Sequence, residues 1–187
     1  MKFSMKKVTV LLADGFEEIE ALTVVDLLRR AKVYVDTVSI TDDYTVRGAH
    51  GIPVQTEDLI TEIDFKESDM IVLPGGMPGT TNLKEDENVR KAVQEAYDDV
   101  RYVAAICAAP TILADMGLLK GKRATCYPDM ESEIEDAYLT GAPVATDENI
   151  ITSQGVGTAI DFALKLIEVL ISEEKAVEIA DSIVYQR

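Results

Sequence analysis

The fold is indicated most clearly by one stretch, Arg101-Tyr-Val-Ala-Ala-Ile-Cys107-Ala-Ala-Pro110-Thr-Ile-Leu113, in which a cysteine separates two kinds of segment. The residues before Cys107 are apolar and strand-like, and those after it favour a helix. Pro110 fits the first turn of that helix, where its missing N–H leaves no hydrogen bond unmade. A strand that passes into a helix with almost no loop is typical of parallel α/β sheets, which bind ligands at the carboxyl ends of their strands. Cys107 is therefore predicted to lie where a ligand site is expected.

Cys107 itself has two interpretations. Free backbone N–H groups and the positive end of the helix dipole would lower the pKa of the thiol and favour the thiolate. A buried cysteine that only packs as a small hydrophobic side chain would look the same in sequence. This stretch alone does not decide between a reactive and a structural cysteine.

Strand-like and helix-like segments alternate along the rest of the chain. Strands are expected at 7–13, 34–40, 69–73, 102–106, 123–126, 144–146 and 150–153, with a turn between short edge strands at 46–56. Helices are expected at 17–31, 88–99, 108–116, 130–137, 158–171 and 174–182. This alternation predicts a single domain over residues 1–187, with a doubly wound, mostly parallel sheet sandwiched between helices.

The overall composition narrows the range of partners. The 187 residues include 34 acidic and 18 basic ones, which gives a formal charge of −16. Such a surface repels nucleic acid and anionic membranes, so neither is an expected partner. The apolar run from Val8 to Ala13 is too short for a signal peptide, and no segment is long enough to cross a membrane. We therefore expect a cytoplasmic, reduced protein, with Met1 and Met5 equally suitable as its start.

Glu20 stands out because of its place in the predicted helix. At helical spacing it shares a side with the apolar residues Val24, Leu27, Leu28 and Ala31. A carboxylate on that side must be paired or neutral, and a raised pKa would keep it protonated and able to donate a hydrogen bond. Alternatively, Glu20 lies at the edge of the apolar stripe and reaches water. The residues alone leave this open.

Two glycine-rich turns also follow predicted strands. They read Leu73-Pro-Gly-Gly-Met-Pro-Gly79 and Ser153-Gln-Gly-Val-Gly157-Thr158. Turns of this kind expose backbone N–H groups that can hold an anion or an oxyanion. Neither matches a phosphate-binding fingerprint, so a flavin or nucleotide is not expected. Both are predicted to lie at the same edge of the sheet as Cys107.

Histidine and metal chemistry have little support in the sequence. The only histidine, His50, falls in a segment that is predicted to be a peripheral, exposed turn. A cysteine–histidine dyad needs a base within hydrogen-bond reach of the sulfur, and His50 would meet Cys107 only from a partner subunit. One histidine and the separated Cys107 and Cys126 form no ligand cluster, so no metal or other cofactor is expected.

Four motifs together resemble the ThiJ/PfpI superfamily, in particular its small single-domain branch. They occur in the family's order and span nearly the whole chain. They are Leu11-Leu-Ala-Asp-Gly-Phe-Glu-Glu-Ile-Glu20, Val72-Leu-Pro-Gly-Gly-Met-Pro-Gly79, Ala104-Ala-Ile-Cys-Ala-Ala-Pro110 and Thr152-Ser-Gln-Gly-Val-Gly-Thr158. The resemblance implies a flavodoxin-like α/β sandwich that forms a homodimer.

The resemblance also implies roles for individual residues. Cys107 matches the family's reactive cysteine, and Glu20 matches the protonated glutamate that tunes it. The backbone N–H groups of Gly75, Gly76 and Ala108 match those that line a small anion pocket. Both open questions above are then resolved in favour of a functional site.

Two departures from the family pattern limit which of the family's activities the resemblance implies for this chain. Protease-like members have a histidine directly after the cysteine, and Ala108 in that place argues against protease activity. Several members have a histidine in the strand after the elbow helix, and here Tyr127 stands at that position. Tyrosine is a poor base near neutral pH, which weakens the case for glyoxalase or deglycase catalysis. Cys126 is either a resolving thiol for Cys107 or a packed strand residue.

Two functions are consistent with these residues. In the leading one, the Cys107 thiolate attacks a small α-oxoaldehyde or a glycated group, and Glu20 moves the proton in the glyoxalase or deglycase manner. In the alternative, oxidation of Cys107 makes the protein an oxidative-stress sensor or a redox-regulated chaperone without turnover.

Overall fold

The computed structural model describes residues 5–186, and the predicted start at Met1–Ser4 lies outside this range. Within it, a central sheet of seven strands has the order β10-β11-β7-β6-β1-β2-β5. Neighbouring strands are parallel except β10 and β11, which form the predicted hairpin. Along the chain the strands are β1 (Lys7–Leu12), β2 (Tyr34–Ser39), β5 (Asp58–Leu59), β6 (Met70–Leu73), β7 (Tyr102–Ile106), β10 (Val144–Asp147) and β11 (Ile150–Ser153).

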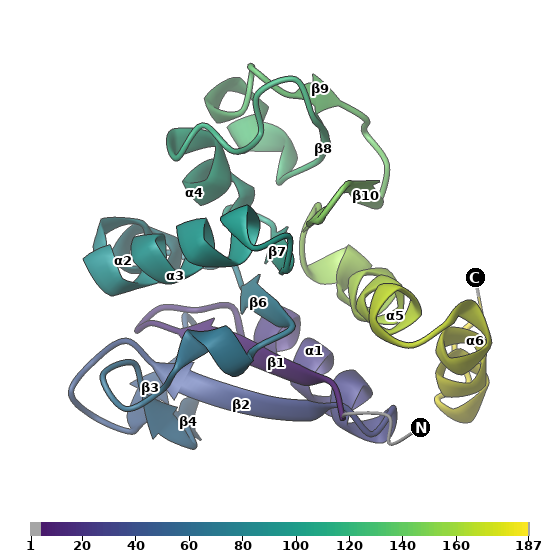
Figure 1. Ribbon diagram of the computed structural model, residues 1–187, viewed down its shortest axis with the longest axis horizontal. Coiled ribbons are helices and arrows are strands. Elements are labelled where there is room, and N and C mark those ends of the chain that lie inside the picture. The colour runs from purple at the N-terminus through teal and green to yellow at the C-terminus, as the bar shows by residue number, and fades with distance from the viewer. Residues whose placement is uncertain (1–4, 187) are drawn as a thin grey trace.

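Helices cover both faces of this sheet, as Figure 1 shows. One face is packed by α1 (Glu18–Arg30), α5 (Ala159–Leu170) and α6 (Glu173–Ser182). The other is packed by α2 (Gly79–Glu85), α3 (Glu87–Asp98) and α4 (Pro110–Asp115). The predicted flavodoxin-like, doubly wound α/β fold is therefore confirmed.

The two layers follow from the alternation of side chains along each strand. In β1, Val8, Val10 and Leu12 contribute to the core beneath α1 and α5, whereas Leu11 contributes to the core beneath α3 and α4. A strand that is apolar on both faces is buried on both faces, which is the pattern expected of a parallel sheet between helices. The carboxyl ends of β1, β6, β7 and β11 then meet at one edge.

Short elements surround this frame. The predicted edge strands at 46–56 are β3 (Thr45–Arg47) and β4 (Pro53–Gln55), which form a separate antiparallel pair. The predicted strand at 123–126 is shortened to β8 (Arg123–Ala124) and pairs with β9 (Tyr138–Leu139) outside the main sheet. Three short 3₁₀ segments complete the described chain, η1 (Phe65–Glu67), η2 (Pro128–Glu133) and η3 (Val156–Thr158).

Two helix predictions differ from the structure. The segment 130–137 is not an α-helix; the 3₁₀ segment η2 occupies its start, and Ile134 is its only buried hydrophobic residue. Without an apolar stripe to bury, an acidic segment has little to hold it in a helix. Helix α2 was not predicted, because its sequence Gly-Thr-Thr-Asn is a poor helix former. Leu83, which is fully buried, anchors α2 to the core.

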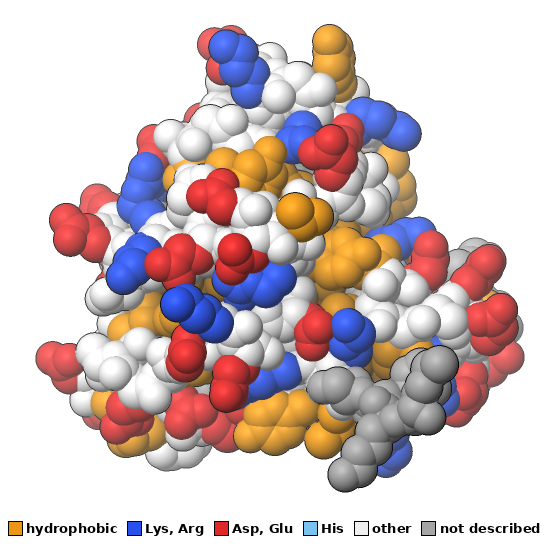
Figure 2. Space-filling view, viewed as in Figure 1, with side chains coloured by type: hydrophobic (Ala, Val, Ile, Leu, Met, Phe, Trp, Pro, Cys, Tyr) orange, Lys and Arg blue, Asp and Glu red, His pale blue; other side chains and the backbone are white. Residues whose placement is uncertain are grey.

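Charged side chains of both signs lie on the surface. On the face shown in Figure 2, acidic and basic side chains are interspersed, and no single basic patch gathers there. Among residues 5–186, no helix is both long enough and apolar enough to cross a lipid bilayer.

Candidate active site

Cys107 lies at the corner between β7 and α4, as its sequence predicted. Its backbone has φ of 65°, in the left-handed region that a non-glycine residue seldom adopts. The Cys107 N–H donates to the Ser153 carbonyl over 2.9 Å, and the Cys107 carbonyl accepts the Tyr127 N–H over 2.8 Å. These bonds to β11 and to the start of η2 hold the unusual conformation. Strain of this kind concentrates at functional sites.

Glu20 approaches Cys107 from the first turn of α1. Its side chain is fully buried, so the interpretation that places it at a water-exposed edge is wrong. The Gly75 N–H donates to Glu20 Oε2 over 2.9 Å. Glu20 Oε1 has no partner of good hydrogen-bond geometry within the described chain. The carboxyl group is thus fixed through one oxygen and presents the other to the site.

Burial dominates the titration of both groups. It raises the pKa of Glu20 to about 7, although hydrogen bonding with Cys107 and the Gly75 N–H acts in the opposite direction. Burial, followed by the charge of Glu20 and its hydrogen bond, raises the pKa of Cys107 to about 12. The backbone N–H groups of Ala108 and Gly76 lower it, but they do not compensate. The predicted lowering of the thiol pKa is therefore wrong, because burial and a neighbouring carboxylate outweigh the N–H groups.

The two shifts describe one coupled pair. Between pH values of about 7 and about 12, Glu20 and Cys107 together hold a single proton. The proton is either on the sulfur, with a buried carboxylate, or on the carboxyl group, with a thiolate. Transfer of the proton to Glu20 would give a thiolate without loss of a proton from the site.

The backbone N–H groups that were predicted to line one anion pocket act on two different side chains, Glu20 and Cys107. The Gly75 N–H binds Glu20, whereas the Gly76 and Ala108 N–H groups act on Cys107. Gly75 must be glycine, since a Cβ there would lie 2.7 Å from Cys107 Cβ and 2.7 Å from Glu20 Oε2. The second glycine-rich turn contributes Gly155, which sequence reasoning did not single out within its motif. A Cβ at Gly155 would touch Cys107 Sγ at 3.7 Å.

Tyr127 lies near Cys107, Glu20 and Gly155. A Cβ at Gly155 would also lie 3.7 Å from Cδ2 of the Tyr127 ring and 3.8 Å from Glu20 Oε1. Tyr127 therefore is a neighbour of Cys107 in space. Cys126 is fully buried behind it, and its thiol donates to the Tyr127 carbonyl over 3.3 Å. Burial raises the pKa of Cys126 to about 11, which agrees with a packed thiol.

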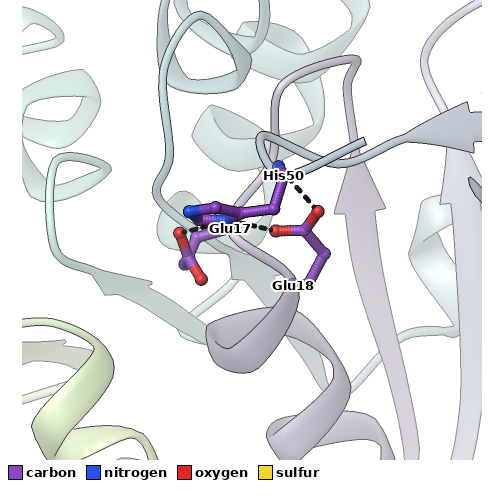
Figure 3. Close-up of side chains that lie close together, drawn as sticks. All are labelled: Glu17, Glu18 and His50. Carbon is purple, nitrogen blue, oxygen red and sulfur yellow. Dashed lines mark hydrogen bonds and ion pairs between the residues drawn. The ribbon is translucent and has the colours of Figure 1, made fainter. Parts of the chain in front are cut away.

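His50 is paired elsewhere, as Figure 3 shows. Its Nδ1 lies 2.8 Å from Glu18 Oε2 and 3.6 Å from Glu17 Oε2, and its backbone N–H donates to Glu18 Oε1 over 2.8 Å. The hydrogen bond with Glu18, then the charges of Glu17 and Glu18, raise the pKa of His50. Burial acts to raise the pKa of Glu18, but the hydrogen bond with the His50 side chain and those from the backbone N–H groups of Glu18, His50 and Ile52 together outweigh it, so that pKa is lowered. These contacts fasten the β3–β4 turn to the start of α1.

Within the described part of the chain, Glu17, Glu18 and His50 form a cluster whose side chains are of the kinds that bind metal ions. Their donor atoms lie within 4.8 Å of one another. Imidazole and carboxylate are ordinary metal ligands. However, His50 Nδ1 and Glu18 Oε2 already satisfy each other, and the cluster needs no ion to be stable. We therefore interpret it as a structural contact.

Comparison with known proteins identifies relatives of the chain and of its fold. A model of the DJ-1/PfpI family matches residues 6–169. DJ-1 homolog B of Arabidopsis thaliana is 39% identical over 186 residues, which are 98% of this chain but only 42% of that protein. A Schizosaccharomyces pombe protein named glutathione-independent glyoxalase DJ-1 is 34% identical over 182 residues, covering 91% of this chain and 94% of that one. The crystal structure of Drosophila melanogaster DJ-1beta matches with a TM-score of 0.94 and 33% identity, over 98% of this chain and 100% of that one.

Proposed function

The chain belongs to the DJ-1/PfpI family, and we propose that it is a thiol enzyme for reactive α-oxoaldehydes or for the groups that they glycate. One observation carries the proposal: a fully buried Glu20 in hydrogen-bonding contact with Cys107 at a strained strand-to-helix corner. This arrangement supplies a nucleophile, a proton carrier and backbone donors close together at one edge of the sheet. The yeast relative named as a glyoxalase supports the same chemistry.

The proposed reaction is a rearrangement followed by hydrolysis. With its proton on Glu20, the Cys107 thiolate forms a C–S bond to the aldehyde carbon, and Glu20 gives its proton to the resulting alkoxide. The Glu20 carboxylate then removes the proton of that carbon and returns it to the adjacent carbonyl carbon, while the hydroxyl proton passes to the former carbonyl oxygen, which leaves the thioester of a 2-hydroxy acid. Water cleaves the thioester, releases the 2-hydroxy acid and restores the thiol. The Gly76 and Ala108 N–H groups stabilise the oxygen anions on this route.

The test is the formation of lactate from methylglyoxal by the purified protein. Cys107→Ala and Glu20→Gln are expected to lose turnover, because each removes a group that the scheme requires. Cys126→Ala is the matched control and should keep it, since Cys126 is packed away from solvent. Turnover that persists in Cys107→Ala would rule the proposal out.

A second candidate function is oxidation sensing without turnover. Cys107 is half-buried, and a sulfinate on it would meet the Gly76 and Ala108 N–H groups and the Glu20 carboxyl group. Mild peroxide should then add oxygen to Cys107 and leave Cys126 unmodified, as mass spectrometry of peptides would show. Equal oxidation of the two cysteines would contradict this function.

The partner that we propose is a second copy of the chain. A groove of about 620 Å³ along α1 is lined largely by apolar side chains, among them Ile19, Leu22, Ile52 and Ile160. Ile19 and Ile52 are each about half exposed, and burying them in a homodimer would remove apolar surface from water. Light scattering should give the mass of a dimer, and Ile19→Glu should give a monomer. We also propose that the protein is cytoplasmic, as its sequence led us to expect.

A further inference from the structure

His50 lies outside the reacting pair, but it contacts the helix turn that carries Glu20. Its Nδ1 lies 2.8 Å from Glu18 Oε2 and 3.6 Å from Glu17 Oε2, and Figure 3 shows the imidazole ring between the two carboxylates. Glu17 immediately precedes α1, and Glu20 is three residues further along the chain. Residues three apart are neighbours on the surface of a helix. A change of charge at His50 is therefore made within one helical turn of Glu20.

The backbone joins Glu17 and Glu20 to the loop beside Cys107. The Glu17 N–H donates to the Gly75 carbonyl over 2.8 Å, and the Gly75 N–H donates to Glu20 Oε2 over 2.9 Å. Gly75 thus holds the start of α1 and the Glu20 carboxyl group in a fixed arrangement. The Glu17 side chain is only 13% exposed, so water and salt screen its charge less than that of a surface residue. The charge of Glu17 therefore acts on Glu20.

The charge of this cluster changes with pH. With His50 neutral, the imidazole and the two carboxylates carry two negative charges, and with His50 protonated they carry one. The hydrogen bond with Glu18 and the charges of Glu17 and Glu18 raise the pKa of His50, so it is protonated at pH 6 and loses its proton as the pH rises. The other charged residues of the turn are bonded to its backbone: Arg47 donates to a carbonyl over 3.0 Å, and Asp14 Oδ1 accepts the Arg47 N–H over 2.8 Å.

The place of this charge determines its effect on the pair. Positive charge near a carboxyl group stabilises the ionised form. The charge of Glu17 raises the pKa of Glu20, whereas the strongest influences on the Cys107 thiol are burial and Glu20 itself. Protonated His50 lies beside the same Glu17 carboxylate and acts with the opposite sign, so it favours the Glu20 carboxylate. Once His50 is neutral, Glu20 binds the shared proton more strongly and the fraction of thiolate rises.

We propose that His50 is a positioning residue that controls where the shared proton lies. Protonated His50 favours the proton on the Cys107 sulfur, and neutral His50 favours its transfer to Glu20, which leaves a thiolate. No proton is gained or lost by the pair in this transfer. The inference rests on the proposed function for the identity of the reacting thiol, and it adds a dependence of that thiol's reactivity on the charge of a residue outside the pair.

The first experiment measures the alkylation of Cys107 by iodoacetamide, an uncharged reagent, in a Cys126→Ala background. His50→Lys keeps a positive charge from pH 6 to pH 9, and His50→Gln has none. At pH 9 the rate should be about 1.5-fold to 5-fold lower in His50→Lys than in His50→Gln, since exposed charge pairs have effects of this size. The parent should lie between the variants at pH 7.5 and match His50→Gln at pH 9. At pH 6 the three rates should differ little, because Glu20 is protonated in each.

The second experiment measures the same coupling from the other side. His50 is the only histidine of the chain, so the NMR signal of its imidazole can be followed without assignment in protein that carries no histidine tag. If His50 acts on Glu20, then Glu20 acts on His50 to the same extent. Glu20→Gln removes a negative charge and should lower the pH at which His50 titrates. The matched control is Lys91→Gln, since Lys91 is 75% exposed on α3, and it should move neither the NMR titration nor the alkylation rates.

Other outcomes overturn the inference. Equal alkylation rates in His50→Lys and His50→Gln at pH 9, including an equal loss in both, mean that the charge of residue 50 does not reach the pair and that its role is only structural. A His50 titration that stays in place in Glu20→Gln means the same. The turnover assay with Cys107→Ala decides the proposed function separately. If methylglyoxal is not turned over but the two alkylation rates diverge as described, the proposed function fails and the control by His50 stands.

Discussion

Glu20→Gln should make the protein more stable than its parent at alkaline pH, and this advantage should shrink as the pH falls. Burial raises the pKa of Glu20 to about 7 in the folded protein, from an ordinary value of 4.5. Between these two values the folded state holds a proton that the unfolded chain has released. The free energy of unfolding of the parent therefore falls as the pH rises through this window, and it levels off above the folded pKa.

The size of the effect follows from the width of that window. Each unit of difference between the pKa values in the folded and unfolded states changes the free energy of unfolding by about 1.4 kcal/mol. Between pH 5.5 and pH 8.5 the parent should lose about 2 kcal/mol that Glu20→Gln does not lose. Glutamine keeps an oxygen acceptor for the Gly75 N–H, so the variant preserves the contact that positions residue 20.

Urea unfolding of both proteins across this pH range measures the difference. Reductant is present throughout, and the protein concentration is held constant because self-association would shift the apparent stability. Titrating groups that do not interact with Glu20 cancel in the subtraction, and Cys107→Ala in both proteins removes the coupled thiol. Glu135→Gln, at an exposed position, controls for the loss of one negative charge. A difference that is independent of pH, or that grows toward low pH, would refute the argument from burial.

Three further substitutions test the structure elsewhere. Val100 has φ of 59° after α3 and is 76% exposed, so Val100→Gly should relieve strain and add about 0.5–1 kcal/mol to the free energy of urea unfolding. Gly75→Ala would place a Cβ 2.7 Å from Cys107 Cβ, and it should cost about 1–3 kcal/mol in the same assay. Glu18→Ala removes the acceptor of the His50 N–H, so amide hydrogen exchange should accelerate in the β3–β4 turn while α3 stays protected. The strain at Val100 would be contradicted if Val100→Gly did not raise the free energy of unfolding. The close approach at Gly75 would be contradicted if Gly75→Ala did not lower it, and the role of Glu18 would be contradicted if hydrogen exchange were unchanged in Glu18→Ala.

The fold was predictable because its signals are local. The central strands β1, β6 and β7 are short apolar runs, and the long helices carry apolar stripes, so the alternation of β and α segments could be read directly. The short elements were less predictable, since packing decides them. Helix α2 forms against its own propensity because Leu83 is buried, and segment 130–137 stays out of an α-helix because it has almost nothing to bury.

The sequence allowed us to predict which residues form the site, but not the direction in which the pKa of its thiol is shifted. Cys107, Glu20 and the glycine turns all fall at strand or helix ends, and a parallel sheet brings such ends to one edge. The direction of the thiol pKa shift was missed, because it depends on how deeply Cys107 is buried and on the distance to a carboxyl group from another element. Gly155 was missed as an individual residue, since its importance lies in what its absent side chain would touch.

The raised pKa of Cys107 fits a nucleophile once the pair is treated as one unit. A thiolate of higher pKa is intrinsically a stronger nucleophile, and its usual disadvantage is that little of it is ionised at neutral pH. Glu20 reduces that disadvantage, because its raised pKa makes it a better acceptor for the thiol proton than an ordinary carboxylate. The proton then lies beside the alkoxide that forms when the thiolate attacks. A histidine base would separate charge in a buried pocket, whereas this carboxyl–thiol pair carries one negative charge before and after the proton moves. Burial raises both pKa values, and the movement of the proton within the pair leaves the charge of the buried site unchanged.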